Sequence, residues 1–325
     1  MLLADGLRAD TARDYMGYLH ALHDAGRAQW AELRCEMPSL SRPLYATLLN
    51  GEPPLAHGIL GNGHAGQVGQ ALPRHLFQVL QAQGLRSAVA AYHWFYELLS
   101  GEVFDPTRHR DALPAGTGIV GARWYWEDDY PDSHLLADAE SLRSTHAPSL
   151  LFVHPMGPDL AGHVHGGEST AYAMSARKLD MLLAQYLPRW HAAGYDLLLT
   201  SDHGMNADRM HGGPLSVERE VPLIWVPHDA GAAGGVGGVA AASAAGASDA
   251  AGDADADGAA GIADTAATAV DGRGAEAASR ADDKSHRAAP PALRPPLPKR
   301  QTEIAAWVLM QLGLTPPDSM KAFRA

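Results

Sequence analysis

The sequence lacks several features that would each assign it to a class of protein. Its 325 residues include a single cysteine, Cys35, so no intramolecular disulfide can form and a reducing compartment is compatible. No apolar run reaches the roughly 18 residues that a membrane helix needs. No signal-peptide pattern opens the chain. These absences predict a cytoplasmic protein that does not span a membrane.

Positive charge is also scarce, and the chain has a formal net charge of −12. No basic stretch provides the electrostatic footprint of a nucleic-acid-binding protein. The acidic excess is concentrated in residues 229–290, which contain ten acidic and four basic residues and therefore half of the net charge. This Ala-, Gly- and Asp-rich stretch has almost no large apolar residues, so it cannot form a core and is expected to be disordered.

The composition divides the chain into three parts. Residues 1–228 are expected to form a catalytic α/β domain. Residues 229–298 form the disordered insertion, which ends in a Pro-rich spacer. Folded sequence resumes in residues 299–325, where Thr302 to Leu312 has one apolar face and predicts a helix that completes the catalytic domain.

Short apolar runs alternate with helical patterns, which predicts an α/β fold with a mostly parallel central sheet and helices on both faces. The expected strands are residues 1–4, 31–37, 87–91, 149–153, 195–200 and 221–226, and the expected helices are 10–23, 76–82, 132–144, 168–187 and 302–312, with another near Pro43. The aromatic and acidic stretch 124–130 is interpreted as a loop. The first strand is short for a central strand, so either the start codon lies upstream or the strand is clipped.

The most informative stretch follows the apolar run at 195–200 and reads Ser201-Asp202-His203-Gly204-Met205. Ligand sites of open α/β sheets lie at the carboxyl ends of strands. A carboxylate and a neutral imidazole are good ligands for Zn²⁺ or Mn²⁺. A helix-capping Asp beside a surface His is the alternative interpretation of this stretch alone.

Further residues of the same kinds occupy equivalent positions. Asp5 follows the first strand, and His211 precedes the strand at 221–226. Asp159 and His163 are four residues apart, which places both side chains on one side of a helix. Together these acids and imidazoles have the composition of a hydrolytic centre with two metal ions.

A hydroxyl group completes this set. Ser41 lies two residues before Pro43, which suits the first turn of a helix, so Ser41 is expected at the N-cap or just before it. An ordinary capping Ser is one explanation. The other is a nucleophile at a helix N-terminus, where free N–H groups and the helix dipole favour an anion. Ser39 is the competing candidate, because residues two apart in an extended segment face the same side.

These motifs, in this order, resemble the alkaline phosphatase superfamily, and in particular its type I phosphodiesterase/nucleotide pyrophosphatase branch. The resemblance rests on Asp5-Gly6-Leu7-Arg8, on His57-Gly58-Ile59 with Asn62, and on Pro158-Asp159-x-x-Gly162-His163, together with Ser201 to Met205 and His211-Gly212. It covers nearly the whole chain apart from the insertion.

The resemblance implies a role for each residue. Asp159, His163 and His211 would hold one divalent metal ion, and Asp5, Asp202 and His203 a second, with zinc expected and manganese the alternative. Ser41 would attack as an alkoxide and form a phospho-serine intermediate, although this branch usually has Thr there. The expected substrate is a small phosphate ester with a phosphodiester or pyrophosphate-type bond.

One departure from the branch keeps other functions open. Leu44 stands where these diesterases usually have an Asn that contacts the phosphate. A phosphomonoesterase or a phosphonate hydrolase on the same scaffold is therefore an alternative. A metal-binding relative without catalytic activity is the alternative from another class. The sequence does not predict the oligomeric state.

Overall fold

The computed structural model describes residues 1–63, 69–228 and 296–320. The expected disordered insertion, residues 229–298, lies outside this part of the chain except for its last three residues. Within the described ranges, no helix is long and apolar enough to cross a membrane.

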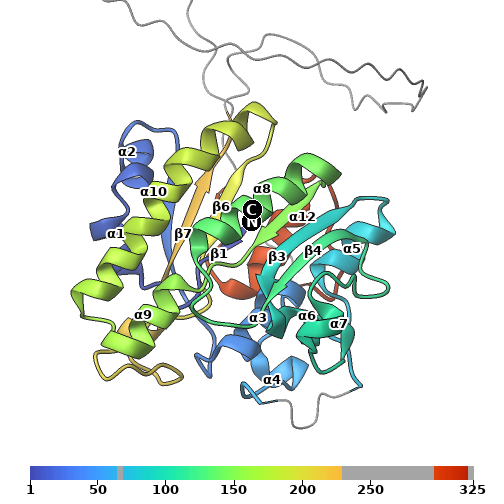
Figure 1. The fold of residues 1–325 in the computed structure, drawn as a ribbon, viewed down its shortest axis with the longest axis horizontal. Coiled ribbons are helices and arrows are strands. Elements are labelled where there is room, and N and C mark those ends of the chain that lie inside the picture. Colours follow the sequence, from blue (N-terminus) through green and yellow to red (C-terminus); the bar gives the residue numbers. More distant parts are fainter. Residues whose placement is uncertain (64–68, 229–295, 321–325) are drawn as a thin grey trace, which may run out of the picture. The chain divides into compact units, whose positions relative to one another are not determined.

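The described residues form a seven-stranded sheet in the order β2-β7-β6-β1-β5-β3-β4 (Figure 1). The strands are β1 (Leu2–Leu3), β2 (Gln29–Arg34), β3 (Ser87–Tyr92), β4 (Ile119–Tyr125), β5 (Leu150–Val153), β6 (Leu197–Thr200) and β7 (Glu220–Val226). Neighbours from β6 to β4 pair in parallel, whereas β7 is antiparallel to β6 and β2 is antiparallel to β7. The expectation of a mostly parallel α/β sheet is therefore confirmed.

The shortest strand lies at the centre of the sheet. β1 pairs with β5 through Leu2 opposite Val153, and with β6 through Leu2 opposite Leu199. Its two residues point to opposite faces, as pleated strands require. Leu2 belongs to one apolar cluster and Leu3 to the other, and both are fully buried.

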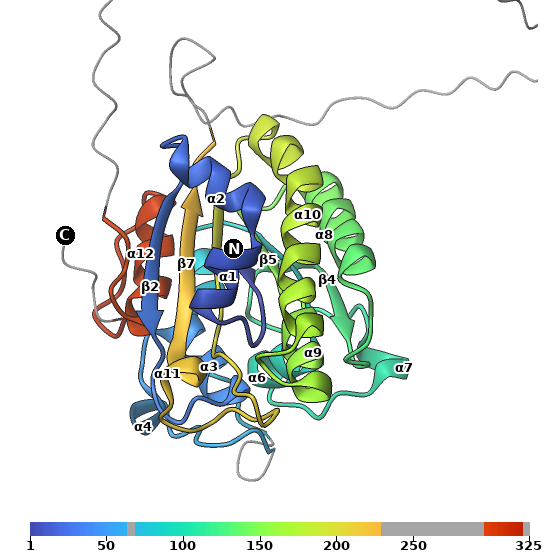
Figure 2. The same ribbon diagram turned by 90° about the vertical axis from the view of Figure 1, so that its left-hand side faces the viewer.

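A layer of helices covers each face of the sheet, and each apolar cluster joins one of these layers to the sheet (Figure 2). The layer that contacts Leu2 consists of α1 (Ala9–Tyr15), α2 (Gly17–Asp24), α8 (Asp132–His146) and α10 (Thr170–Ala192). The layer that contacts Leu3 consists of α3 (Ser41–Asn50), α5 (Leu76–Ala82), α6 (His93–Ser100) and α12 (Ile304–Gln311). Shorter helices are α4 (Pro54–His57), α7 (Pro106–His109), α9 (Gly157–His165), α11 (Ser216–Arg219) and a 3-10 turn at Gln301–Glu303.

Helix α12 shows how the residues after the insertion join this core. Ile304 and Trp307 are buried in the same cluster as Leu3. The Trp307 ring meets the ring of Trp225, on β7, edge-on at a centroid distance of 5.3 Å. The last described helix therefore packs against the sheet.

Several element boundaries differ from the expectations. The long helix does not end at Pro188 but continues to Ala192, and buried Leu187 and Trp190 pack on either side of the proline. The expected helix 10–23 is two helices that meet at Met16. The stretch 124–130, interpreted as a loop, begins with the last two residues of β4, which pair with β3.

The topology brings the predicted site residues to one edge of the sheet. β1, β2, β5 and β6 run in the same direction, so the connections after them emerge at the same edge. These connections carry Asp5, Ser41, Asp159 and Asp202. β7 runs in the opposite direction, so the segment before it, with His211, reaches this edge too.

Candidate metal centre

Asp5, Asp202, His203 and Ser41 lie together at the carboxyl edge. His203 Nε2 is 3.0 Å from Ser41 Oγ, 3.2 Å from Asp202 Oδ2 and 3.6 Å from Asp5 Oδ1. The two carboxylates and the imidazole are fully buried, and Ser41 is 3% exposed. The structure therefore brings the predicted nucleophile and three predicted ligands around one point.

The other three predicted ligands lie beside this group, nearer to solvent. His163 Nε2 is 3.2 Å from His211 Nε2 and 3.5 Å from Asp159 Oδ2. His211 Nε2 is 4.0 Å from Asp159 Oδ1. Asp159 and His163 project from α9, one helical turn apart, as their spacing predicts.

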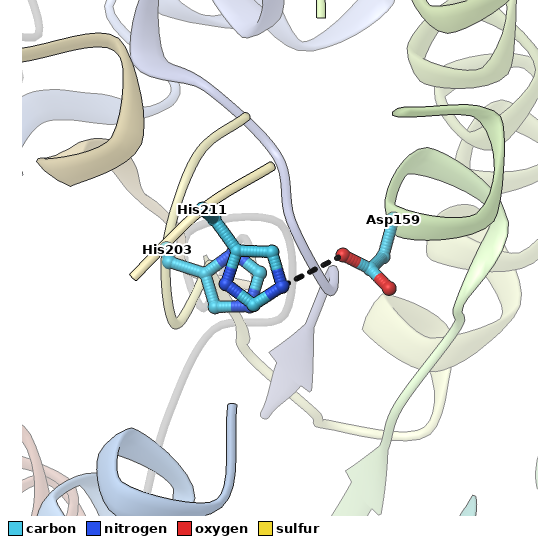
Figure 3. A group of neighbouring side chains, drawn as sticks. All are labelled: Asp159, His203 and His211. Atoms are coloured by element: carbon cyan, nitrogen blue, oxygen red, sulfur yellow. Dashed lines mark ion pairs between the residues drawn. The ribbon is translucent and has the colours of Figure 1, made fainter. Parts of the chain in front are cut away.

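The two groups adjoin at His203 (Figure 3). The His203 and His211 rings stack at a centroid distance of 3.6 Å, and Asp159 points toward them from α9. Ligand atoms of Asp159, His203 and His211 lie within 4.8 Å of one another, as do those of Asp5, Asp202 and His203. The six residues therefore line one continuous site.

The three histidines have the same hydrogen-bonding arrangement. Each Nδ1 lies near a backbone carbonyl oxygen: His203 near Gly204 at 2.9 Å, His211 near Ser39 at 2.9 Å, and His163 near Arg209 at 3.0 Å. A carbonyl oxygen only accepts, so each Nδ1 carries a proton, which leaves Nε2 as the ring nitrogen whose lone pair can bind a metal ion. All three lone pairs are thus available for a metal ion.

The three carboxylates each present an oxygen that lacks a hydrogen-bond partner among the described residues. These buried atoms are Asp5 Oδ1, Asp159 Oδ1 and Asp202 Oδ2. The other oxygen of Asp202 accepts a hydrogen bond from Gly6 N at 3.2 Å. A buried oxygen without a partner is costly, and cations held among these oxygens and the three Nε2 atoms would satisfy all three oxygens.

The electrostatics of the site also favour a cation. Burial raises the pKa of Asp5 to about 7, and burial together with the Asp5 carboxylate raises the pKa values of Asp159 and Asp202 well above the usual range. Burial lowers the pKa of His211 to about 4 and that of His203 well below its usual value. His203 and His211 are therefore neutral at pH 7, and a bound cation would favour the ionised carboxylates.

The two candidate nucleophiles have different surroundings. Ser41 is the first residue of α3 rather than its N-cap, which is Leu40, and its hydroxyl faces His203. Ser39 Oγ instead donates to Gly213 O at 2.8 Å and accepts from Gly212 N at 3.1 Å. Ser39 therefore connects the segment before α3 to the loop that carries His211.

The start of α3 offers fewer free N–H groups than the sequence suggests. Arg42 N donates to Asn62 Oδ1 at 3.1 Å, and Leu44 N donates to Leu40 O at 3.1 Å. Pro43 has no N–H. Leu44 is fully buried, and the side chain that meets the backbone next to Ser41 is Asn62.

Sequence reasoning missed two residues that contact Asp5. Tyr45 OH and His154 Nε2 both donate to Asp5 Oδ2, the latter at 2.7 Å. Both are buried, and burial lowers the pKa of His154 to about 3, so this imidazole is neutral. The only sequence signal was the position of His154 directly after the strand at 149–153.

Gly6 makes room for the neighbouring ligand. Its φ is +64°, and a Cβ atom there would lie 2.8 Å from Asp159 Oδ1 and 2.9 Å from Asp159 Cα. Both the backbone conformation and the space therefore require glycine at this position.

A cavity of about 430 Å³ lies elsewhere, at the amino ends of β1, β5 and β6. Its walls include Trp190, Tyr195 and Trp307 but none of the six predicted metal ligands. The chemical groups of the carboxyl edge, rather than this cavity, therefore identify the candidate site.

Comparisons with known proteins concern the family and the fold of the chain. A family model described as type I phosphodiesterase/nucleotide pyrophosphatase matches residues 1–246. No curated protein sequence matches the chain.

Solved structures with a similar fold come from several proteins. Murine ectonucleotide pyrophosphatase/phosphodiesterase 5 is 16% identical, with 63% of this chain and 56% of that one covered and a TM-score of 0.49. A Bacteroides thetaiotaomicron protein from a glycosaminoglycan-metabolism locus is 14% identical, with 69% and 66% covered and a TM-score of 0.52. Phosphonoacetate hydrolase from Sinorhizobium meliloti is 22% identical, with 62% and 55% covered and a TM-score of 0.44. The chain thus spans little more than half the length of the murine protein.

Proposed function

The chain belongs to the type I phosphodiesterase/nucleotide pyrophosphatase family, within the alkaline phosphatase superfamily, and on this premise we propose that it is a metal-dependent phosphoester hydrolase. Its substrate would be a small phosphate ester with a phosphodiester or pyrophosphate-type bond. Residues 1–228 and the helix after the insertion would together form the catalytic domain.

One observation carries this proposal. Three histidine Nε2 atoms and three buried carboxylate oxygens that accept no hydrogen bond from the described residues face one site beside Ser41. This donor set fits two divalent cations, with Asp5, Asp202 and His203 around one and Asp159, His163 and His211 around the other. Mixed carboxylate and imidazole ligands suit Zn²⁺, with Mn²⁺ as the alternative. When bound, such ions neutralise phosphate oxygens and favour the ionised form of a nearby hydroxyl.

The residues of the chain supply the remaining steps. Ser41 Oγ would form a bond to phosphorus while the bond to the leaving oxygen breaks, which gives a phospho-serine. Water would then cleave the phospho-serine and restore Ser41. Asn62 Oδ1 accepts from Arg42 N, so the Asn62 amide lies close to Ser41, where its N–H groups would donate to a phosphate oxygen.

The test compares substrates on one preparation. Protein loaded with Zn²⁺ would be assayed with bis-p-nitrophenyl phosphate, p-nitrophenyl phosphate and a phosphonate, and Ser41→Ala would be assayed in parallel. Fastest turnover of the diester, lost in the variant, is expected. Preference for another substrate would favour the monoesterase or phosphonate hydrolase. Metal binding without turnover of any of the three would favour the inactive relative.

A further inference from the structure

One oxygen of the Asp5 carboxylate is fully engaged by protein donors. Tyr45 OH and His154 Nε2 both donate to Asp5 Oδ2. Asp5 Oδ1 accepts no hydrogen bond from the described residues and lies 3.6 Å from His203 Nε2. The carboxylate therefore has one oxygen turned toward the protein and the other toward the candidate metal site.

The role of His154 as a donor is fixed by its other ring nitrogen. His154 Nδ1 accepts the backbone N–H of Tyr92 at 3.4 Å, so the proton of the neutral ring is on Nε2. That proton points at Asp5 Oδ2, 2.7 Å away. His154 thus links the end of β3 to the residue that follows β1.

Aromatic packing holds the two donors in place. The Tyr45 ring stacks on Phe95 at a centroid distance of 4.3 Å and meets the His154 ring edge-on at 5.1 Å. Phe95 also contacts the His154 ring, at 4.9 Å. All three side chains are buried, so neither donor can turn away from Asp5 without disturbing the core.

We propose that Tyr45 and His154 are positioning residues that restrict Asp5 to binding a metal ion through Oδ1 alone. A carboxylate oxygen has two lone pairs, and the two donors occupy both lone pairs of Oδ2. Asp5 then supplies one ligand atom, whereas an unrestrained carboxylate can supply two. This inference rests on the metal-dependent function proposed above.

The restriction limits the coordination number of the inner site. Asp5 Oδ1, Asp202 Oδ2 and His203 Nε2 supply three atoms, and Ser41 Oγ lies 3.0 Å from the last of these. With a fourth position on the side of Ser41, these residues would suit the four-coordinate geometry of zinc sites that keep one position open. Asp202 Oδ1 is held less firmly: it accepts Gly6 N at 3.2 Å, and the Ser201 hydroxyl, 3.3 Å away, lies nearer to another acceptor, His203 O, at 2.7 Å.

Cobalt(II) provides a test that does not depend on turnover, because its visible absorption is much stronger in four-coordinate than in six-coordinate sites. Wild-type protein, Tyr45→Phe and the control Tyr125→Phe would be titrated with Co²⁺. The control also removes a buried hydroxyl that donates to a carboxylate, Asp138, at 3.0 Å. In Tyr45→Phe we expect weaker absorption and a loss of about 10- to 100-fold in affinity at one of the two sites. The control should match the wild type.

A second pair of variants tests the other donor, His154, and controls for misfolding. His154→Leu removes the donor and should show the same weaker Co²⁺ absorption as Tyr45→Phe. His154→Gln keeps an N–H donor and should retain part of the absorption that His154→Leu loses. Unchanged spectra and affinities in both Tyr45→Phe and His154→Leu would overturn the positioning role. Absence of Co²⁺ binding by the wild type would instead overturn the proposed function, and the positioning role with it.

Discussion

Ser41 Oγ lies 3.0 Å from His203 Nε2, although the two residues are 162 positions apart in the chain. The hydroxyl reaches the imidazole because α3 begins directly at Ser41, at the same edge of the sheet where β6 delivers His203. Ser39, two residues earlier, makes its hydrogen bonds to the loop after His211 instead. This contrast separates two serines that the sequence leaves as rival nucleophiles.

Substitution of the two serines should therefore have different effects. Ser41→Ala removes the attacking oxygen and should lower kcat at least about a thousandfold, with the fold and most metal binding retained. Ser39→Ala should cost far less activity, but it should destabilise the protein by about 1 kcal/mol through its lost hydrogen bonds. Steady-state kinetics measures the loss of activity in both variants, and thermal unfolding measures the loss of stability. Ser41→Thr provides a conservative comparison. Full activity in Ser41→Ala would refute the assignment.

Metal removal should abolish activity and lower the Tm. The wild type is expected to hold two divalent ions, whereas His211→Ala and Asp202→Ala should each weaken a different site. At a free metal concentration of 100 times Kd, each site adds about 2.7 kcal/mol to the free energy of unfolding. Elemental analysis and thermal unfolding with and without a chelator measure both effects. Active protein without bound metal would contradict the proposal.

Gly6→Ala should weaken metal binding in addition to straining the backbone. An alanine at φ +64° is strained, and its Cβ would also collide with Asp159. Gly26→Ala is a matched control, because Gly26 has φ +69° but none of the described residues places an atom within 4 Å of the added Cβ. We expect about 1–3 kcal/mol of destabilisation in both variants. Only Gly6→Ala should also weaken metal binding in a calorimetric titration, and equal metal affinity in the two variants would rule out the steric role of Gly6.

Asp5→Asn should change how the stability of the metal-free protein depends on pH. The pKa of Asp5 is about 7 in the folded protein and about 4 when unfolded. The folded state therefore binds more protons between these values, and the Asp5 contribution to stability falls as pH rises from about 4 to about 7. Because Asn does not titrate, the difference in unfolding free energy, variant minus wild type, should increase across this window. Urea unfolding of both proteins, after a chelator has removed the metal, measures this difference in free energy at each pH. A difference that does not change with pH would contradict the raised pKa of Asp5.

Much of the fold and the placement of the site residues followed from local sequence patterns. The apolar run before Asp202 and the four-residue spacing of Asp159 and His163 are short-range signals, and α9 and β6 form as they predict. Parallel strands then bring their carboxyl ends together whatever lies between them. The placement of Asp5 follows from this rule, whereas His211 reaches the same edge because β7, which it precedes, runs antiparallel to β6.

Other features depend on contacts between distant residues and left no local signal. Tyr45 lies inside a helix and His154 after a strand, and only the packed structure shows that both reach Asp5. The continuation of α10 through Pro188 depends similarly on the burial of Leu187 and Trp190, which outweighs the loss of one backbone hydrogen bond.

The distribution of the ligands along the chain has a consequence for protein synthesis. Asp5 leaves the ribosome before the other ligands, but both groups of ligands are complete only after His211 has emerged. β1, which holds Asp5 in the sheet, pairs with β5 and β6, both made much later. A nascent chain therefore cannot assemble the full centre. Metal uptake is expected to follow the folding of the completed sheet rather than to guide its first steps.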